Sequence, residues 1–273
     1  MIEKTDNHLV LLKLITSTTI ALLLVIISSG PIHAAQKRLD PQVADSLVAL
    51  TDDPLVKADY YSDAWLFEKE LAVLQSSGSK DAETLWRLAR THIDLGERLE
   101  GKEALAKFEV ALDQAQEAVD LNPKIAKAQQ TLATACGRVA LHKGVFQSLG
   151  LVKRVHKAAL LAVATGDSIP VAMYILGRTH KKLLEKPKFA RNLLGLGWVR
   201  EDSVSYYFDK ALKVSGGNMI QCRTEYADFL IQEKNDDSKA KALLEEALKL
   251  PIRDENDPKE IEWARKMLSD IAK

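Results

Sequence analysis

Lysine and arginine side chains are the groups in this sequence with the clearest capacity to bind a ligand. Residues 121–166 contain seven of them and no Asp or Glu, and residues 121–200 contain 14 basic and 2 acidic residues. Residues 35–120 hold 10 basic and 18 acidic residues, and residues 201–273 hold 12 and 16. Such a basic centre attracts an anionic partner, although salt screens it over about 8 to 10 Å. Alternatively, the centre pairs with the acidic flanks or with a second copy of the chain.

Patterns that indicate catalysis or a bound cofactor are missing from the sequence. His92, His142, His156 and His180 have neither His-x-x-x-His spacing nor the nearby cysteines that a zinc site requires. Ser203 has no partner base in a recognisable motif, as nucleophilic catalysis would need. The sequence therefore predicts no catalytic residue, no cofactor and no metal, so binding is the expected activity. An enzyme with an unfamiliar site is the remaining alternative.

A large apolar residue followed by a very small one recurs along the chain. These pairs are Leu88-Ala89, Leu132-Ala133, Leu176-Gly177 and Tyr226-Ala227, separated by 44, 44 and 50 residues. Between them lie segments with apolar residues at i, i+4 and i+7, such as Ala111, Ala115 and Ala118. A small residue lets a partner helix approach closely, and neither helix buries its apolar face alone. The chain is thus predicted to be all-α, a superhelical stack of antiparallel helix pairs.

The two ends of this stack carry helix-start signals. Asp53-Pro54 combines a capping side chain with a first-turn proline, and the apolar spacing that follows predicts one helix over residues 54–75. Asp257-Pro258 predicts the start of the last helix in the same way. This last helix is expected to cap the open end of the stack.

Two segments of the repeat have the spacing of a known helical repeat. Residues 111–123 and 240–251 carry the Ala, Ala or Leu, Ala, Pro spacing of tetratricopeptide (TPR) repeats, although the period of 44 exceeds the usual 34. With such stretched repeats, the run Trp86-Arg87-Leu88-Ala89-Arg90 resembles the regulator of microtubule dynamics family over roughly residues 82–273. The resemblance implies a TPR-like fold with a C-terminal capping helix and a scaffold or tethering role.

The TPR resemblance also implies a binding groove, because the first helix of each pair lines the concave face in TPR stacks. Positions around the large-small pairs give the candidate partner-binding residues: Trp86, Arg90, Lys127, Gln130, Thr134, Tyr174, Arg178 and Lys181. Arg90 and Arg178 are the strongest candidates, because an arginine fork binds a carboxylate or phosphate through two parallel hydrogen bonds. For Trp86 and Tyr174, packing between repeats is an equal alternative.

The N-terminus resembles a secretory signal peptide. Residues 14–27 form an uncharged apolar run that follows Lys4 and Lys13 and precedes Gly30-Pro31 and small residues. We expect cleavage after Ala34, which leaves residues 35–53 as an N-terminal segment and residues 54–273 as the TPR-like domain. An uncleaved membrane anchor is the alternative, but the run is shorter than the ~20 residues that span a bilayer.

An exported protein is expected in the periplasm or outside the cell. Only Cys136 and Cys222 remain in the mature chain, and the helices between them should hold them too far apart for a disulfide. Both are predicted to be buried and unbridged. Export also argues against a nucleic-acid partner, and no recognition motif accompanies the basic residues.

These observations predict a non-catalytic scaffold that binds an acidic peptide or protein in a basic groove. The alternative is a module that binds an anionic lipid or another small amphiphile, with the apolar residues 192–199 as a lid. The oligomeric state is left open by the sequence.

Overall fold

The computed structural model describes residues 38–144, 147–165 and 169–272, and these residues form helices and no strands. The chain divides into Met1–Ala35 and Gln36–Lys273, and all described residues belong to the second part. The predicted signal peptide, residues 1–34, lies outside the described residues. None of the described helices is both long and apolar enough to span a bilayer.

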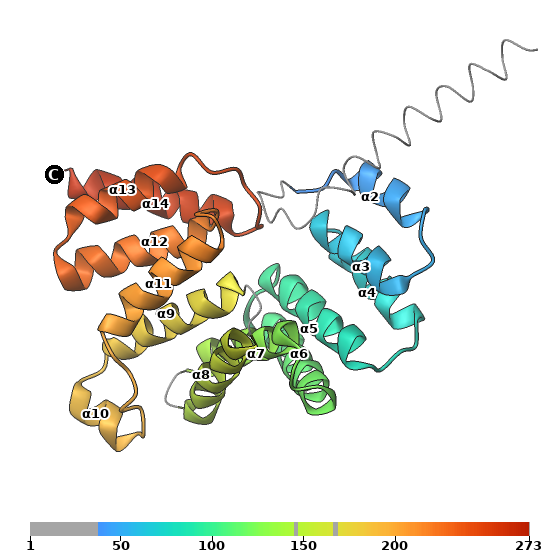
Figure 1. Ribbon diagram of the computed structural model, residues 1–273, viewed down its shortest axis with the longest axis horizontal. Helices are drawn as coiled ribbons and strands as arrows, with labels where there is room; N and C mark the ends of the chain where they lie inside the picture. Colours follow the sequence, from blue (N-terminus) through green and yellow to red (C-terminus); the bar gives the residue numbers. More distant parts are fainter. Residues whose placement is uncertain (1–37, 145–146, 166–168, 273) are drawn as a thin grey trace, which may run out of the picture. The chain divides into compact units, whose positions relative to one another are not determined.

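The helices follow one another in chain order (Figure 1). Their bounds are α2 Pro41–Val48, α3 Pro54–Asp63, α4 Phe67–Ser76, α5 Ala82–Glu97, α6 Gly101–Leu121, α7 Ala126–Lys143, α8 Leu149–Ala164, α9 Pro170–Leu184, α10 Lys188–Leu193, α11 Asp202–Val214, α12 Ile220–Phe229, α13 Asp237–Ala247 and α14 Asp257–Ile271. A π-helical turn, Leu230–Lys234, extends α12. The stretched repeats are explained in part by long helices such as α6, which has 21 residues.

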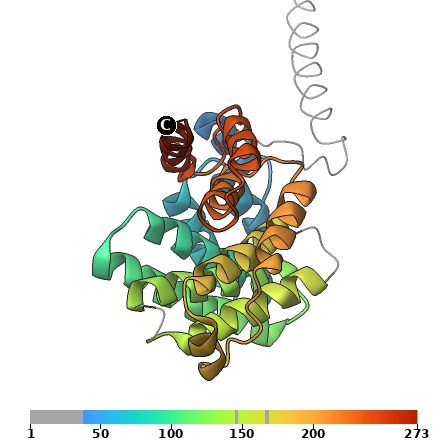
Figure 2. The same ribbon diagram turned by 90° about the vertical axis from the view of Figure 1, so that its left-hand side faces the viewer.

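Neighbouring helices pack as pairs: α5 with α6, α7 with α8, α9 with α11, and α12 with α13. The four large-small pairs fall within α5, α7, α9 and α12, the first helix of each pair. Helix α14 packs against α12 and α13, as a capping helix should (Figures 1 and 2). The predicted all-α, TPR-like stack of antiparallel helix pairs is confirmed.

Small residues at the helix contacts allow this close packing. Ala111, Ala115 and Ala118 on α6 are completely buried. At Gly177 on α9, an added Cβ would lie 2.9 Å from Cδ1 of Phe208, whose ring is itself completely buried. The ring thus fills the space that glycine leaves, and removing such a buried Phe typically costs about 3 to 5 kcal/mol.

The single helix predicted over residues 54–75 is wrong, because the structure ends α3 at Asp63 and begins α4 at Phe67. Between them Trp65 adopts a left-handed φ of 59°, which is uncommon for a large side chain. Tertiary contacts fix this break: Arg38 donates to the Ala64 carbonyl at 3.3 Å, and Arg98 to the Trp65 carbonyl at 2.8 Å. Both arginines come from outside the segment, so its local apolar spacing did not reveal the break.

The loop before α14 is held by a carboxylate. Asp257, predicted as the helix cap, is instead the first residue of α14. Its Oδ2 accepts hydrogen bonds from the backbone N–H groups of Arg253 at 2.8 Å and Asp254 at 2.9 Å. This fixes the shape of the loop over residues 251–256.

Both cysteines behave as predicted. Cys136 and Cys222 are buried and unbridged, each within a hydrophobic cluster. Burial raises the pKa of the Cys136 thiol to about 11, so both act as small apolar side chains.

Candidate functional site

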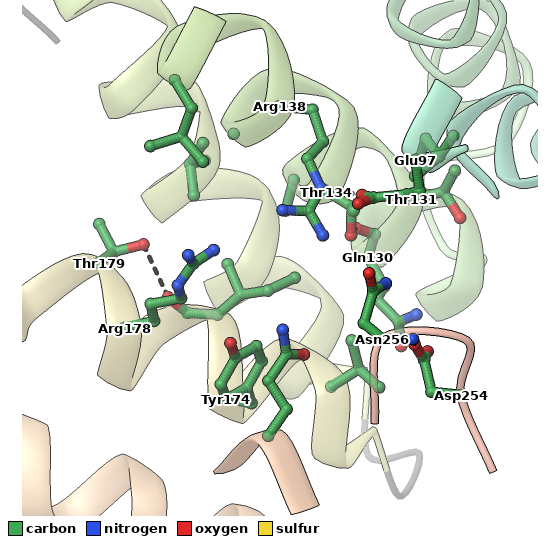
Figure 3. A pocket seen from close by; sticks show the side chains of 18 of the residues that line it. Glu97, Gln130, Thr131, Thr134, Arg138, Tyr174, Arg178, Thr179, Asp254 and Asn256 are labelled. Carbon is green, nitrogen blue, oxygen red and sulfur yellow. Dashed lines mark hydrogen bonds and ion pairs between the residues drawn. The ribbon is translucent and has the colours of Figure 1, made fainter. Parts of the chain in front are cut away.

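The first helices of the pairs enclose a pocket of about 520 Å³. Side chains from α5, α7 and α9 line it together with Val152 and Val155 of α8, residues 218–221 at the start of α12, and the loop residues 253–257. Figure 3 shows Arg138, Tyr174 and Arg178 directed into the same space from α7 and α9. The pocket therefore lies on the face that the TPR resemblance assigned to the groove, and the loop before α14 forms part of its wall.

Five of the eight predicted groove residues line this pocket: Arg90, Gln130, Thr134, Tyr174 and Arg178. They come from α5, α7 and α9, which shows that the repeat register places equivalent positions around one cavity. Whether these side chains bind a partner stays a prediction.

The other three predicted residues lie elsewhere. Trp86 is buried beside Leu85 and Ala118, with its indole N–H donating to Glu83 at 2.8 Å, so it packs between repeats. Lys127 is exposed on α7, outside the pocket lining.

Lys181 is a buried structural cation. Its Nζ lies 2.5 Å from Oε2 of Glu225 and 2.6 Å from Asp228, and only 9% of its side chain is exposed. Its position one turn from the predicted groove points it toward α12 instead of into the pocket.

One end of the pocket is organised by Arg90. Its Nη2 donates to Oε1 of Glu70 at 2.7 Å and to Oδ1 of Asp59 at 3.2 Å. Glu70 is completely buried, and its Oε2 has no hydrogen-bond partner among the described residues. Burial therefore outweighs Arg90 and raises the pKa of Glu70. Burial likewise raises the pKa of the neighbouring Asp94 well above its usual value, against the attraction of Arg90.

The opposite end is organised by Glu225. This carboxylate, 5% exposed, accepts from Nε of Arg178 at 2.9 Å as well as from Lys181. Burial alone would raise its pKa, but Lys181 and Arg178 together outweigh burial and lower it. The hydrogen bond to Glu225 uses Nε of Arg178 and leaves the two terminal nitrogens out of that bond.

Several buried polar atoms of the pocket-lining residues have no hydrogen-bond partner among the described residues. They include the hydroxyl of Tyr174, a residue only 6% exposed, and Oε1 of Gln130. Burial raises the pKa of Tyr174 well above its usual value, so the phenol stays protonated and able to donate. An unsatisfied buried donor is costly, and a bound ligand would relieve that cost.

The pocket wall contains further polar residues that the candidate positions did not include. Asp94, Arg138 and Lys182 occupy equivalent positions in α5, α7 and α9, each 44 residues apart and one turn beyond Arg90, Thr134 and Arg178. The same repeat spacing would have found them if the register had been extended by four residues. Arg253 and Asp254 come from the loop before α14 and follow no repeat pattern.

Acidic side chains from the flanking segments neutralise part of the positive charge of residues 121–200. Arg138 forms an ion pair with Glu97, and Arg178 pairs with Glu225, so residues from the acidic flanks meet the basic band. The pocket wall contains acidic as well as basic groups: Asp94, Glu97, Asp254 and Asp257 beside Arg90, Arg138, Arg178, Lys182 and Arg253. The pocket is thus of mixed charge, and the pairing of the band with its flanks accounts for part of the asymmetry in the sequence.

A clasp joins the two ends of the repeat array. Arg98, just after α5, donates from Nη2 to Oε1 of Glu255 at 2.6 Å and from Nε to Oε2 at 2.9 Å. The same guanidinium reaches Glu68 at 3.1 Å. These contacts hold the loop before α14, which contributes Arg253 and Asp254 to the pocket wall, against the α4–α5 region.

The apolar residues 192–199 do not line this pocket. Leu196 and Val199 are buried against Ala140, Val152 and Leu183, which belong to α7, α8 and α9. The structure therefore uses Leu196 and Val199 for packing and does not place the stretch over the pocket.

Comparison with known proteins adds a family and a fold. A crystal structure of a thermophilic TPR protein from Thermus thermophilus is similar with a TM-score of 0.52 and 18% identity, covering 85% of this chain and 97% of that chain. At this identity the likeness concerns the fold alone. No curated protein matches the chain. The family model described as regulator of microtubule dynamics protein 1-3 matches residues 53–272, and the chain therefore belongs to this family.

Proposed function

We propose that this protein is a non-catalytic scaffold that binds an acidic segment of a partner protein in the pocket between α5, α7, α9 and α12. A TPR-like fold indicates binding of protein partners in general, and such folds are typically non-catalytic. The observation that carries the acidic partner is a set of donors in the pocket wall. The Tyr174 hydroxyl and Nε of Arg253 have no hydrogen-bond partner among the described residues, and the terminal nitrogens of Arg178 take no part in its bond to Glu225.

These donors suit a carboxylate. A guanidinium with free terminal nitrogens binds a carboxylate through two parallel hydrogen bonds, and a charge-assisted hydrogen bond is about twice as strong as a neutral one. Glu225 already fixes Arg178 through Nε, so the side chain would lose little entropy when it binds a ligand. The acidic wall residues would restrict where along the pocket a carboxylate binds, which favours an extended segment with spaced acidic side chains over a densely charged one.

Arg253 offers the cleanest test, because its Nε has no hydrogen-bond partner among the described residues. By contrast, Arg90 and Arg178 both hold buried glutamates, and reversing their charge would damage the fold. We expect Arg253→Glu to weaken binding of an acidic peptide by about ten-fold, the loss of one charged hydrogen bond. Fluorescence polarisation with a labelled Glu-containing peptide and its Gln counterpart measures this.

The matched control is Arg265→Glu, which makes the same charge change at an exposed position of α14 outside the pocket. If both variants weaken binding equally, only long-range charge matters and the pocket is not the site. If the Gln peptide binds as well as the Glu peptide, the acidic nature of the partner is refuted.

The second candidate function is binding of an anionic lipid or small amphiphile. The observation that favours it is the apolar part of the same wall, where Ile93, Val155 and Ile175 lie beside the arginines. Native mass spectrometry of the purified protein separates the two functions. A retained mass of lipid size that is displaced by added fatty acid supports the amphiphile, and an empty protein that binds the acidic peptide supports the scaffold.

Export of the protein, to the periplasm or beyond the cell, is part of the proposal. The order of basic residues, apolar run and small residues in positions 1–34 supports it. Cell fractionation followed by N-terminal sequencing should find a chain that begins at Ala35 outside the cytoplasm. A chain that retains residues 14–27 in the membrane fraction would support the anchor instead.

A further inference from the structure

Helix α10 presents two large apolar side chains to solvent. Phe189 is 75% exposed and Leu193 is 86% exposed, the highest values among the large hydrophobic residues that the structure describes. They are four residues apart and therefore lie on the same face of the helix. Single exposed hydrophobic residues are ordinary, but two such residues paired on one face usually mark an interaction surface.

The residues that follow α10 anchor it to the repeat array. Nη1 of Arg191 donates to the Val199 carbonyl at 3.1 Å, and the Leu196 N–H donates to the Arg191 carbonyl at 2.7 Å. Leu196 is 2% exposed and Val199 is 7% exposed. Both views show α10 projecting beyond the ends of α9 and α11 (Figures 1 and 2). The apolar pair thus stands on a projecting element that is anchored to the repeat array.

Lysines dominate the charge around this pair. Lys188 is exposed on α10 itself, directly before Phe189. On α8, Lys153 is exposed, and its Nζ would lie 2.9 Å from a Cβ placed on Gly195, so its ammonium group adjoins the loop after α10. Across residues 181–200 the only acidic residue is Glu185, whose carboxylate pairs with Lys182.

We propose that α10 docks the protein onto an anionic membrane surface, with Phe189 and Leu193 entering the interfacial region while the surrounding lysines face lipid phosphates. Apolar insertion and attraction of lysines to anionic lipids add in such binding, and each basic residue near the surface contributes measurably. A projecting apolar pair fits between lipid headgroups, whereas a protein partner would need a matching pocket. This surface is separate from the pocket and does not depend on the function proposed for it.

Site-specific fluorescence on the full chain tests the proposal. Because Cys136 and Cys222 are buried, Leu193→Cys provides a position for selective attachment of an environment-sensitive dye. Vesicles of phosphatidylglycerol and phosphatidylcholine that carry nitroxide-labelled acyl chains quench a dye that enters the bilayer. We expect strong quenching at position 193 on these vesicles and little on vesicles of phosphatidylcholine alone.

Leu50→Cys is the matched control, because Leu50 is 73% exposed but its neighbours are Asp45, Asp52 and Asp53. A dye there should stay unquenched even if another part of the chain holds the protein on the vesicle. Adding Phe189→Ala to the 193 label should weaken vesicle binding through α10 by about ten-fold, and Lys188→Glu should weaken it further at low salt.

Three outcomes would overturn the proposal. The first is a dye at 193 that stays unquenched, whether or not the chain sediments with the vesicles. The second is equal quenching on neutral vesicles, which removes the role of the lysines. The third is self-association in sedimentation velocity that Phe189→Ala abolishes, with no quenching, which assigns the face to a second copy.

Discussion

Arg90 and Arg178 stand at equivalent repeat positions, 88 residues apart, yet they stabilise opposite ends of the pocket in different ways. Arg90 reaches back to Glu70 on α4, whereas Arg178 reaches forward to Glu225 on α12. Glu70 accepts from one guanidinium through one oxygen, and no residue in the described part of the chain bonds the other. Both oxygens of Glu225 are used, one by Arg178 and the other by Lys181.

The number of cations around each buried carboxylate explains the difference. With one cation, burial prevails and the pKa of Glu70 rises, and with two, the charges prevail and the pKa of Glu225 falls. Arginines at equivalent repeat positions thus belong to different networks. The carboxylate bound by Arg90 has one cation beside it, and the carboxylate bound by Arg178 has two.

The largest effect is expected from Glu225→Gln. The substitution removes one of the two carboxylates around Lys181, which is almost completely buried, and also removes the ion-pair partner of Arg178. Breaking such a buried pair typically costs about 3 to 5 kcal/mol, and we expect the lower end of that range because Asp228 stays beside Lys181. Urea denaturation at neutral pH should show a large fall in the midpoint with an unchanged slope. The control is Glu185→Gln, which removes a carboxylate from an exposed pair with Lys182 and should change stability by less than about 1 kcal/mol. Equal effects of the two substitutions would mean that Glu225 is not the centre of a stabilising network.

Some residues of these two networks could be predicted from the sequence, and others could not. The spacing of the large-small pairs predicted the helix pairs and put Arg90, Tyr174 and Arg178 on the pocket wall, because repeat register is local information. Glu70 and Glu225 were not foreseen, since each pairs with an arginine 20 to 47 residues away on another helix. A pair of that kind is set by tertiary packing.

The Arg98–Glu255 clasp and the break after α3 also depend on tertiary contacts that the sequence pattern could not predict. Arg98 binds Glu255, a residue 157 positions away, and no periodicity connects them. Arg98 also holds the carbonyl of Trp65, where the predicted helix is interrupted. The pocket wall therefore combines residues of the repeat pattern with loop residues outside it, such as Arg253 and Asp254.

The pH dependence of stability should have opposite signs for the two glutamates. The lowered pKa of Glu225 gives stability that is present above the unfolded value near 4.5 and lost as pH falls below it. The raised pKa of Glu70 gives stability that is present below 4.5 and lost as pH rises through the folded value. As pH rises from 4 to 7, the free energy of unfolding of wild type relative to Glu225→Gln should increase. Relative to Glu70→Gln, it should decrease. Urea midpoints across this range provide the measurement, and parallel curves would show that the two carboxylates share one environment.

Arg98→Ala tests the clasp between Arg98 and Glu255, which joins the two ends of the repeat array. Its guanidinium and the Glu255 carboxylate are about one-third exposed, so the expected loss of global stability is only about 1 kcal/mol. Locally, the loop over residues 251–256 should open more often, and hydrogen exchange of its amides should accelerate several-fold. Lys259→Ala serves as the control, because Lys259 is an exposed residue of α14 beyond this loop. Unchanged exchange in Arg98→Ala would show that Asp257 holds the loop without help from the clasp.

The smallest effect is expected from Glu70→Gln at neutral pH, although Glu70 is more completely buried than Glu225. The amide oxygen can still accept from Arg90, and the substitution removes the cost of holding a charge in a site that only one cation satisfies. Arg90 also keeps its contact with Asp59, so it is not left unpaired. We therefore expect a change of less than about 1 kcal/mol in the free energy of unfolding, of either sign. A loss as large as that of Glu225→Gln would contradict this expectation, because it would mean that Arg90 needs the full charge of Glu70. The two ends of the pocket would then be equivalent in energy as well as in repeat position.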